Sequence, residues 1–458
     1  METKKNKRST FSGKIGFVLS AAGASVGLGN IWRFPYLAAK YGGGIFLLIY
    51  ILLALTFGYT MIVAESALGR MTRKSPVGAF KAFGKKAGWL SFGGWINAII
   101  PVLIVPYYSV IGGWVIKYLI EYVKGNGTKL AADGYFSEFI SNGASTEICF
   151  VIFCLFTLSI IYAGVRNGIE RVSKFMMPIL VVLSVIIAIY SVTRPGAIEG
   201  VKYFLVPNLK NFSWMTVVAA MGQMFYSLSI AMGILITFGS YMKKDSSIED
   251  STRNVEVFDT AIAIMAGLMI IPAVFAFSGG DPDTLQAGPA LMFITIPKVF
   301  ANMGFGTIVG ILFFLLVLFA AVTSSIALTE SAVSTFEDEI GWSRRKSTAV
   351  IGIIMIALGT LSCLGYGPLA FVKIIGMQFL DFFDFLTNSV MMPIAAMMIS
   401  IFVSKVVGID RIEEEIRQGE AAFRRKKIFV VMIKYLCPIF AMIILASSVA
   451  NAFGWISM

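Results

Sequence analysis

The sequence contains no histidine among its 458 residues, and only 14% of them are charged. Without histidine, the chain lacks the most common side chain for proton transfer near neutral pH and the most common ligand of transition metals. Cysteine is scarce, and all four lie in apolar stretches without paired spacing: Cys149, Cys154, Cys363 and Cys437. This pattern favours small core residues over a zinc site or a disulfide framework. No set of nucleophile, base and metal ligands indicates an enzyme.

Apolar residues make up most of the chain. Hydrophobic residues account for 57% of it, and the mean hydropathy is +0.81, which is typical of a protein that crosses the membrane many times. Lysine and arginine exceed the acidic residues by 12, but they lie in short loops beside apolar stretches. They therefore predict membrane topology, and we expect a lipid bilayer and no nucleic acid as partner.

Eleven stretches are apolar and long enough to predict transmembrane helices. They cover residues 14–37, 43–69, 90–122, 147–164, 168–192, 214–240, 255–278, 305–336, 347–364, 376–403 and 428–453. Basic residues cluster before the first stretch and then in every second loop. By the positive-inside rule we expect a cytoplasmic N-terminus, an outside C-terminus and a location in the plasma membrane.

The first stretch is interrupted by Gly27-Leu28-Gly29-Asn30, and Arg33 follows within one turn. Unpaired backbone groups are costly in hydrocarbon, so irregular backbone is found there where it lines a cavity or binds something polar. Two glycines alone would indicate close helix packing. Asn30 and Arg33 favour a binding site instead, because polar groups inside membrane spans are rare and usually functional.

The sixth stretch has a similar interruption, where Gly222-Gln223 and the polar residues up to Ser229 precede Gly233. The first and sixth stretches hold equivalent places in two runs of five helices. This arrangement predicts inverted repeats with a site between two discontinuous helices at the middle of the membrane. Three consecutive hydroxyls, Thr323-Ser324-Ser325, lie in the middle of the eighth stretch.

The predicted fold is an all-α integral membrane protein with about eleven transmembrane helices. We expect one transporter domain over residues 1–458, with a first repeat at 14–192 and a second at 214–403. The helix at 428–453 is then an addition after the two repeats.

These motifs closely resemble the neurotransmitter:sodium symporter family over nearly the whole chain. The matching residues are Gly23-Ala24-Ser25-Val26-Gly27-Leu28-Gly29-Asn30-Ile31-Trp32-Arg33-Phe34-Pro35, Gly222-Gln223, Thr323-Ser324-Ser325, Tyr107-Tyr108 and Asp384. The resemblance implies sodium-coupled import of an amino acid by alternating access. The family usually has twelve spans, and this sequence lacks the last, as some bacterial members do.

The resemblance also implies an amino acid site between the two broken helices. The amides of Leu28 and Gly29 and the hydroxyl of Tyr108 are expected to bind the substrate carboxylate, which suits free N–H groups at helix ends. The other residues expected to bind the substrate are Ser25, Ile104, Tyr226, Ser227, Ser229, Met232, Ser324 and Leu328.

None of these side chains is acidic or basic, which favours a neutral hydrophobic or aromatic amino acid. Met232 stands where a bacterial member has phenylalanine, and a flexible thioether accommodates larger rings. Discrimination would be soft, because one methylene in an apolar pocket is worth only about 1–3 kcal/mol. As an alternative, an inward tilt of the Tyr226 ring beside Ser229 would favour glycine or alanine.

Two sodium sites follow from the same resemblance, and both offer the oxygen ligands that a hard cation prefers. The first would use the Ser25 carbonyl, Asn30, Ser227, Asp259 and the substrate carboxylate. The second would use the carbonyls of Gly23, Val26 and Ala320 with the hydroxyls of Thr323 and Ser324. The second site has no carboxylate, so we expect it to bind sodium more weakly and to release it first.

Asp259 bears on the chloride requirement. Animal members of the family have asparagine at this position and need chloride nearby, whereas a carboxylate supplies the negative charge itself. We therefore expect transport without chloride. The other interpretation is a charge at a helix mouth near Lys243 and Lys244, worth about 0–1 kcal/mol as a surface ion pair; it is less favoured, because carboxylates rarely enter membrane spans without a role.

Two groups of residues are expected to act as gates. Arg33 with Asp384 would close the outer side, and Arg8 with Asp338, beside Tyr241, the cytoplasmic side. Alternating access needs bonds that form in one state and break in the other. An amino acid sensor on the same scaffold, without net transport, remains an alternative. A channel is disfavoured, because it needs a continuous polar pathway.

Overall fold

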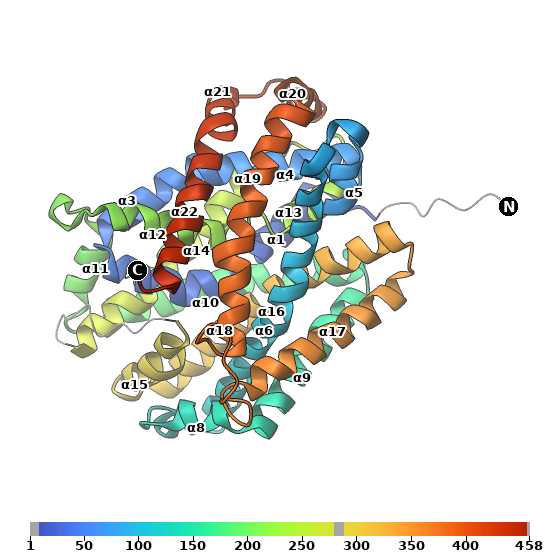
Figure 1. Ribbon diagram of the computed structural model, residues 1–458. Coiled ribbons are helices and arrows are strands. Elements are labelled where there is room, and N and C mark those ends of the chain that lie inside the picture. The colour runs from blue at the N-terminus through green and yellow to red at the C-terminus, as the bar shows by residue number, and fades with distance from the viewer. Residues whose placement is uncertain (1–8, 279–287, 456–458) are drawn as a thin grey trace.

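The computed structural model describes residues 9–278 and 288–455, and helices dominate this part of the chain (Figure 1). Its α-helices are α1 (Lys14–Ser25), α2 (Phe34–Lys40), α3 (Gly44–Leu53), α4 (Tyr59–Thr72), α5 (Pro76–Lys81), α6 (Phe92–Val123), α7 (Gly127–Leu130), α8 (Tyr135–Ser141), α9 (Gly143–Tyr162), α10 (Arg171–Val192), α11 (Ala197–Leu205), α12 (Trp214–Ser227), α13 (Ile234–Ser240), α14 (Ile248–Ser278), α15 (Ile296–Ala301), α16 (Gly306–Ile340), α17 (Arg344–Leu364), α18 (Phe379–Asp384), α19 (Met392–Phe402), α20 (Ile409–Arg417), α21 (Lys426–Val431) and α22 (Cys437–Ala452). Short π-helical turns join several of them, for example α3 to α4 and α18 to α19.

Within the described ranges, nine helical segments are long and apolar enough to cross a membrane. They are Gly44–Thr72, Gly88–Val123, Gly143–Tyr162, Val165–Val192, Ile248–Phe277, Gly306–Ile340, Arg344–Leu364, Phe379–Val407 and Lys426–Ala452. A bent helix pair near the N-terminus is a further candidate span, and α12 with α13 occupies the stretch predicted at 214–240. Each of the eleven predicted stretches therefore contains a helix or a helix pair. Helices satisfy their backbone hydrogen bonds internally, as hydrocarbon requires.

The two predicted helix breaks are confirmed, and they differ in backbone geometry. In the first, Val26 is extended (φ −74°, ψ 92°), and the helices on either side meet at 54°. In the second, between α12 and α13, Ser229, Ala231 and Gly233 have φ of 52°, 59° and 70°. Left-handed backbone costs an L-residue about 1–2 kcal/mol, so the second break needs neighbours that hold it. The division into inverted repeats at 14–192 and 214–403 stays a prediction.

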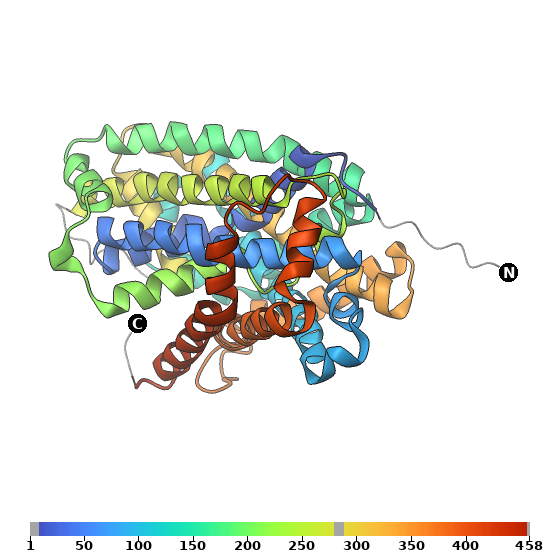
Figure 2. The same cartoon turned by 90° about the horizontal axis from the view of Figure 1, so that it is seen from above.

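Close packing holds the broken helices against their neighbours. At Gly69 of α4 a Cβ atom would lie 1.9 Å from the Ile236 carbonyl oxygen, and at Gly239 of α13 a Cβ would lie 2.5 Å from the Ser66 carbonyl oxygen. Small residues let membrane helices approach this closely. On another side of the molecule, α22 packs against α19, as both views show (Figures 1 and 2).

Candidate functional site

A small cavity of about 30 Å³ lies between the two helix breaks. It is lined by Ala24, Ser25, Gly27, Leu28, Gly29, Asn30, Ile104, Tyr108, Tyr226, Ser229, Met232, Ser324 and Leu328. Ten of the eleven residues predicted to bind the substrate are in this set. The exception is Ser227, whose hydroxyl donates to Asp259 instead. The structure thus brings together side chains from α1, α6, α12, α16 and both breaks.

The first break presents backbone amides to this cavity. The Leu28 N–H donates to the Tyr108 hydroxyl at 3.3 Å, and the Gly27 N–H donates to Asn30 Oδ1 at 3.2 Å. At Gly27 a Cβ would lie 2.7 Å from Ser324 Oγ and 3.0 Å from the Tyr108 hydroxyl oxygen. A side chain at Gly27 would therefore displace the hydroxyls beside the amides.

The Tyr226 ring separates this cavity from a second, wider pocket. A Cβ at Gly29 would lie 2.3 Å from Tyr226 Cδ1, so the ring lies directly on the first break. Gln223 Nε2 donates to the Gly29 carbonyl at 3.0 Å and ties α12 to the same point. Tyr226 lines both the small cavity and the wide pocket, whose volume is about 720 Å³.

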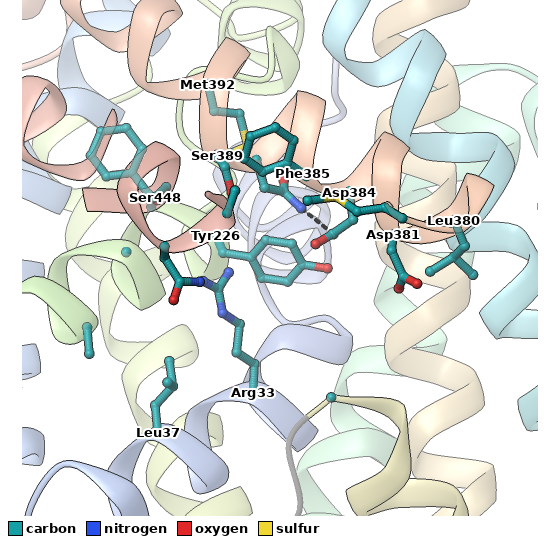
Figure 3. Close-up of a pocket in the computed structure, with 18 of the residues that line it drawn as sticks. Arg33, Leu37, Tyr226, Leu380, Asp381, Asp384, Phe385, Ser389, Met392 and Ser448 are labelled. Carbon is teal, nitrogen blue, oxygen red and sulfur yellow. Dashed lines mark hydrogen bonds between the residues drawn. The ribbon is translucent and has the colours of Figure 1, made fainter. Parts of the chain in front are cut away.

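Both residues of the predicted outer gate line the wide pocket (Figure 3). The Arg33 guanidinium lies 5.2 Å from the centre of the Tyr226 ring. Asp384 accepts hydrogen bonds from the Tyr107 hydroxyl at 3.2 Å and from Asn388 Nδ2 at 2.6 Å. Within the described ranges no ion pair is recorded between Arg33 and Asp384. In this conformation the arginine contacts the aromatic ring that covers the cavity.

Asp259 lies at the centre of a buried cluster of polar side chains, with an exposed fraction of 0%. Its carboxylate accepts from Asn30 Nδ2 at 2.8 Å, from Ser227 Oγ at 2.9 Å and from the Tyr50 hydroxyl at 2.7 Å. The interpretation of Asp259 as a charge at a helix mouth is therefore wrong. Asn30 also lines the cavity, so the predicted first sodium site adjoins the predicted substrate site.

The residues of the predicted second sodium site meet where α1 packs against α16. Ser324 Oγ lies 3.2 Å from the Gly23 carbonyl oxygen and 3.4 Å from that of Val26. The Thr323 hydroxyl donates to the Ala320 carbonyl at 3.2 Å. All of these groups supply carbonyl or hydroxyl oxygens, which suit a hard cation of low charge.

The sequence model of the Sodium:neurotransmitter symporter family matches residues 8–131 and 135–454. The chain belongs to this family. Its members are transporters and not enzymes, and the chain is accordingly a membrane protein with several spans.

Relatives of the transporter agree with this assignment. A Bacillus subtilis (strain 168) protein described as an uncharacterized sodium-dependent transporter, YhdH, is 36% identical and covers 90% of this chain and 91% of its own length. An uncharacterized sodium-dependent transporter of Haemophilus influenzae is 31% identical, over 98% of this chain and 100% of its own. The crystal structure of MhsT in complex with L-phenylalanine is 35% identical, with a TM-score of 0.86 over 96% of this chain and 100% of that one.

The predicted cytoplasmic gate of the transporter is described only in part, because Arg8 lies outside the described residues. Asp338 accepts from the Ser75 N–H at 2.6 Å. The Tyr241 hydroxyl donates to Glu330 Oε1 at 2.7 Å, and Arg344 lies 2.5 Å from the other carboxylate oxygen of Glu330. The polar group around Tyr241 thus includes a buried glutamate that was not predicted.

Sequence reasoning also missed two polar residues of the second span that support the site. Tyr50 donates to Asp259 and lies 3.1 Å from Ser227 Oγ. Glu65 accepts from the Ala231 N–H at 2.8 Å and so holds the left-handed backbone of the second break. A signal existed for both, since polar side chains inside apolar spans are rare and usually functional. The sequence alone did not indicate the hydrogen-bond partner of either residue.

Proposed function

We propose that this transporter imports a neutral hydrophobic or aromatic amino acid together with sodium, by alternating access and without chloride. The observation that carries the proposal is the position of Asn30. It lines the small cavity and also donates to the buried carboxylate of Asp259. A sodium ion beside Asp259 would then contact the carboxylate of an amino acid in the cavity, so that each stabilises the other.

The amides of the first break support recognition of the substrate carboxylate. The Leu28 N–H and the Tyr108 hydroxyl already meet at 3.3 Å, and helix ends with free N–H groups attract anions. The substrate ammonium would then meet carbonyls of the two breaks. The two breaks would therefore recognise the two charged groups that all amino acids share.

The lining of the cavity supports a neutral substrate side chain. None of the thirteen described residues that line it is acidic or basic, and Ile104, Met232 and Leu328 supply apolar surface. MhsT, the structural relative, is described in complex with L-phenylalanine, which agrees with an aromatic substrate. Glycine or alanine is the competing choice, which an inward tilt of the Tyr226 ring beside Ser229 would favour.

A second sodium ion is proposed at the contact of α1 with α16. Its ligands would be the carbonyls of Gly23, Val26 and Ala320 with the hydroxyls of Thr323 and Ser324. Chloride independence is proposed from Asp259, which places a negative charge beside the first sodium ion.

Gating and orientation complete the proposal. Arg33 and Asp384 would approach each other when the outer side closes, and Arg8 with Asp338 and Tyr241 would act on the cytoplasmic side.

The basic loops favour a plasma membrane protein with its N-terminus in the cytoplasm and its C-terminus outside. An alkaline phosphatase fused after Met458 should be active and a green fluorescent protein fused there dark; the opposite result would refute this orientation.

Uptake into proteoliposomes tests the function directly. The purified protein would be reconstituted in vesicles loaded with potassium and given radiolabelled phenylalanine, tryptophan, leucine, alanine, glycine or GABA. The outside buffer would contain sodium or potassium, each as the chloride or the gluconate salt. We expect phenylalanine, tryptophan or leucine to accumulate in sodium and not in potassium, equally in chloride and gluconate.

Each other outcome has a distinct meaning. Sodium-dependent binding without accumulation would indicate a sensor, and accumulation of glycine or alanine alone would replace the proposed substrate class. Loss of uptake in gluconate would refute chloride independence. If no neutral amino acid binds or accumulates in sodium, the proposed function is wrong.

A further inference from the structure

One surface outside the two cavities combines aromatic rings, most of them exposed, with lysines, and we call it the aromatic–lysine patch. It consists of Lys81, Lys85, Lys86, Trp89, Phe92, Trp95, Trp342 and Lys346. These residues come from α5, the loop that leads into α6, the first turn of α6, and the turn between α16 and α17 with the start of α17. None of them lines the small cavity or the wide pocket.

Direct contacts join the three segments of the aromatic–lysine patch. The Lys81 ammonium lies 5.1 Å from the centre of the Trp95 ring and 2.5 Å from Glu339 Oε2 near the end of α16. Trp342 follows Glu339 by one turn, and the Lys346 ammonium lies 4.1 Å from the centre of its ring. The segments that carry the patch therefore lie together beside the start of α6, where α5 also packs (Figure 1).

The rings mark this surface as one that faces the bilayer. Phe92, Trp95 and Ile99 have exposed fractions of 59%, 41% and 40%, and their spacing places them on one face of α6. Because α6 is a membrane span, that face meets lipid. Trp89, which is 73% exposed, lies just before the helix. Tryptophan is enriched at the boundary between hydrocarbon and water, so the lysines of the patch lie at the level of the lipid headgroups.

Basic residues predominate in the patch, although Glu337, Asp338 and Glu339 lie beside it at the end of α16. Residues 73–92 include five basic residues and no acidic one, and residues 344–346 are Arg-Arg-Lys. Part of this charge is compensated, since Lys81 pairs with Glu339 and Arg344 with Glu330. Lys85, Lys86 and Lys346 are exposed. A basic surface beside lipid-facing aromatic rings complements an anion whose apolar part lies in the membrane.

We propose that the aromatic–lysine patch binds the headgroup of an anionic phospholipid. The ammonium groups of Lys85 and Lys86 would contact its phosphate, with Lys81, which also pairs with Glu339, and Lys346 at the edge. The rings of Trp89, Trp95 and Trp342 would lie against the glycerol region and the upper acyl chains. This proposal does not depend on the proposed transport function, because it uses other residues on another surface.

Lipid retention by the purified protein tests the proposal. The full chain would be purified in detergent after incubation with equal amounts of phosphatidylglycerol and phosphatidylcholine, and the bound lipid would be measured by native mass spectrometry. We expect the wild type to retain phosphatidylglycerol over phosphatidylcholine by about fivefold or more, less so at high salt, which screens exposed charges. Equal retention of the two lipids would overturn the proposal.

Matched variants locate the site. In the triple variant Lys81→Gln, Lys85→Gln, Lys86→Gln we expect the preference to disappear. The control variant Lys124→Gln, Lys202→Gln, Lys210→Gln removes the same charge from exposed lysines elsewhere and should keep the preference. A triple replacement of the patch lysines by arginine should also keep it. An unchanged preference in the glutamine variant, with native circular dichroism and gel filtration, would overturn the proposal.

A competition experiment distinguishes a site for lipid from a site for soluble phosphate. Glycerol 3-phosphate carries the same phosphate without acyl chains and would be added at millimolar concentration to the protein–lipid complex. We expect it to leave the bound phosphatidylglycerol in place. Displacement at that concentration would show that the patch binds phosphate alone, and would overturn the lipid assignment. If the glutamine variant does not fold, this experiment and the lipid preference of the wild type still decide the proposal.

Discussion

The two predicted sodium sites both include residues at the first helix break, yet they are built from different chemistry. The first surrounds a fully buried carboxylate, Asp259, to which Asn30, Tyr50 and Ser227 all donate. The second consists of carbonyl and hydroxyl oxygens at the contact of α1 with α16. One site uses a full negative charge, and the other uses only dipoles.

This difference predicts how the two sites would divide their tasks. A carboxylate inside the protein is costly unless it is paired and hydrogen-bonded. Three donors hold Asp259, and we expect this site to bind a cation strongly. The polar groups of the second site have hydrogen-bond partners even without sodium, since the hydroxyls of Thr323 and Ser324 donate to backbone carbonyls. We therefore expect the first site to couple sodium to substrate and the second to respond to the packing of α1 on α16.

The largest expected effect comes from removing the charge of the first site with Asp259→Asn. Interactions with a charged group are worth about 1.5–3 kcal/mol, so the sodium concentration for half-maximal phenylalanine binding should rise about 10- to 100-fold. Chloride should restore part of the affinity, because it returns the missing charge. Scintillation proximity binding with and without chloride measures both.

The matched control for this variant is Asp250→Asn. Asp250 lies near the start of the same helix, α14, with a side chain that is 35% exposed and 3.4 Å from Lys14 Nζ. It should leave sodium dependence unchanged. If Asp259→Asn has the sodium affinity of the wild type, the charge of Asp259 does not distinguish the two sites. The same conclusion follows if its sodium affinity falls and chloride restores none of it.

Tyr50→Phe is expected to have an intermediate effect. It removes the hydroxyl that donates to Asp259 at 2.7 Å and leaves the ring in place, so the buried carboxylate loses one donor. In sodium-free buffer the stability should fall by about 1.5–3 kcal/mol. Sodium should reduce this loss, because the cation compensates the same charge. Thermal unfolding in sodium and in potassium measures the difference.

Tyr162→Phe is a suitable control for Tyr50→Phe, since the Tyr162 side chain is 54% exposed. It should unfold as the wild type does in both salts. An equal loss of stability in sodium and potassium for Tyr50→Phe would mean that the hydroxyl supports packing alone.

Thr323→Val is expected to have the smallest effect, because it removes one hydroxyl from the dipolar site at nearly constant shape. One neutral hydrogen-bonding group is worth about 0.5–1.5 kcal/mol, so half-maximal binding should need about two- to tenfold more sodium. Chloride should not change this result, in contrast to Asp259→Asn. The control is Ser325→Ala, whose hydroxyl lies 3.3 Å from Thr157 on α9. A similar shift in both variants would place the effect outside the predicted site.

Much of the fold was predictable, because its signals are local in the chain. Apolar stretches of sufficient length identify membrane spans, and polar residues beside glycine identified both breaks. The composition of the small cavity was also accessible, since a resemblance of motifs predicted ten of its lining residues to bind the substrate and an eleventh, Asn30, to bind sodium. The role of Ser227 was predicted only in part: its hydroxyl is directed to Asp259 and away from the cavity.

The partners of individual polar groups were not predictable in the same way. Tyr50 and Asp259 are 209 residues apart in the chain, and Glu65 and Ala231 are 166 apart. Contacts of this range depend on how helices pack, and no local pattern specifies them. The contact of the Arg33 guanidinium with the Tyr226 ring also depends on helix packing, because the two residues lie on different helices.

The sequence by itself determined that this chain is a helical membrane protein, where its helices break, and that oxygen atoms and amides lie at the breaks. Those properties follow from hydrophobicity and backbone chemistry, which act over a few residues. Only the tertiary structure decided that Asp259 is buried among three donors, that Glu65 holds the second break, and that one tyrosine ring divides a small cavity from a wide pocket. Their physical basis is burial, because a polar group taken out of water must find its partners wherever the packing of distant helices places them.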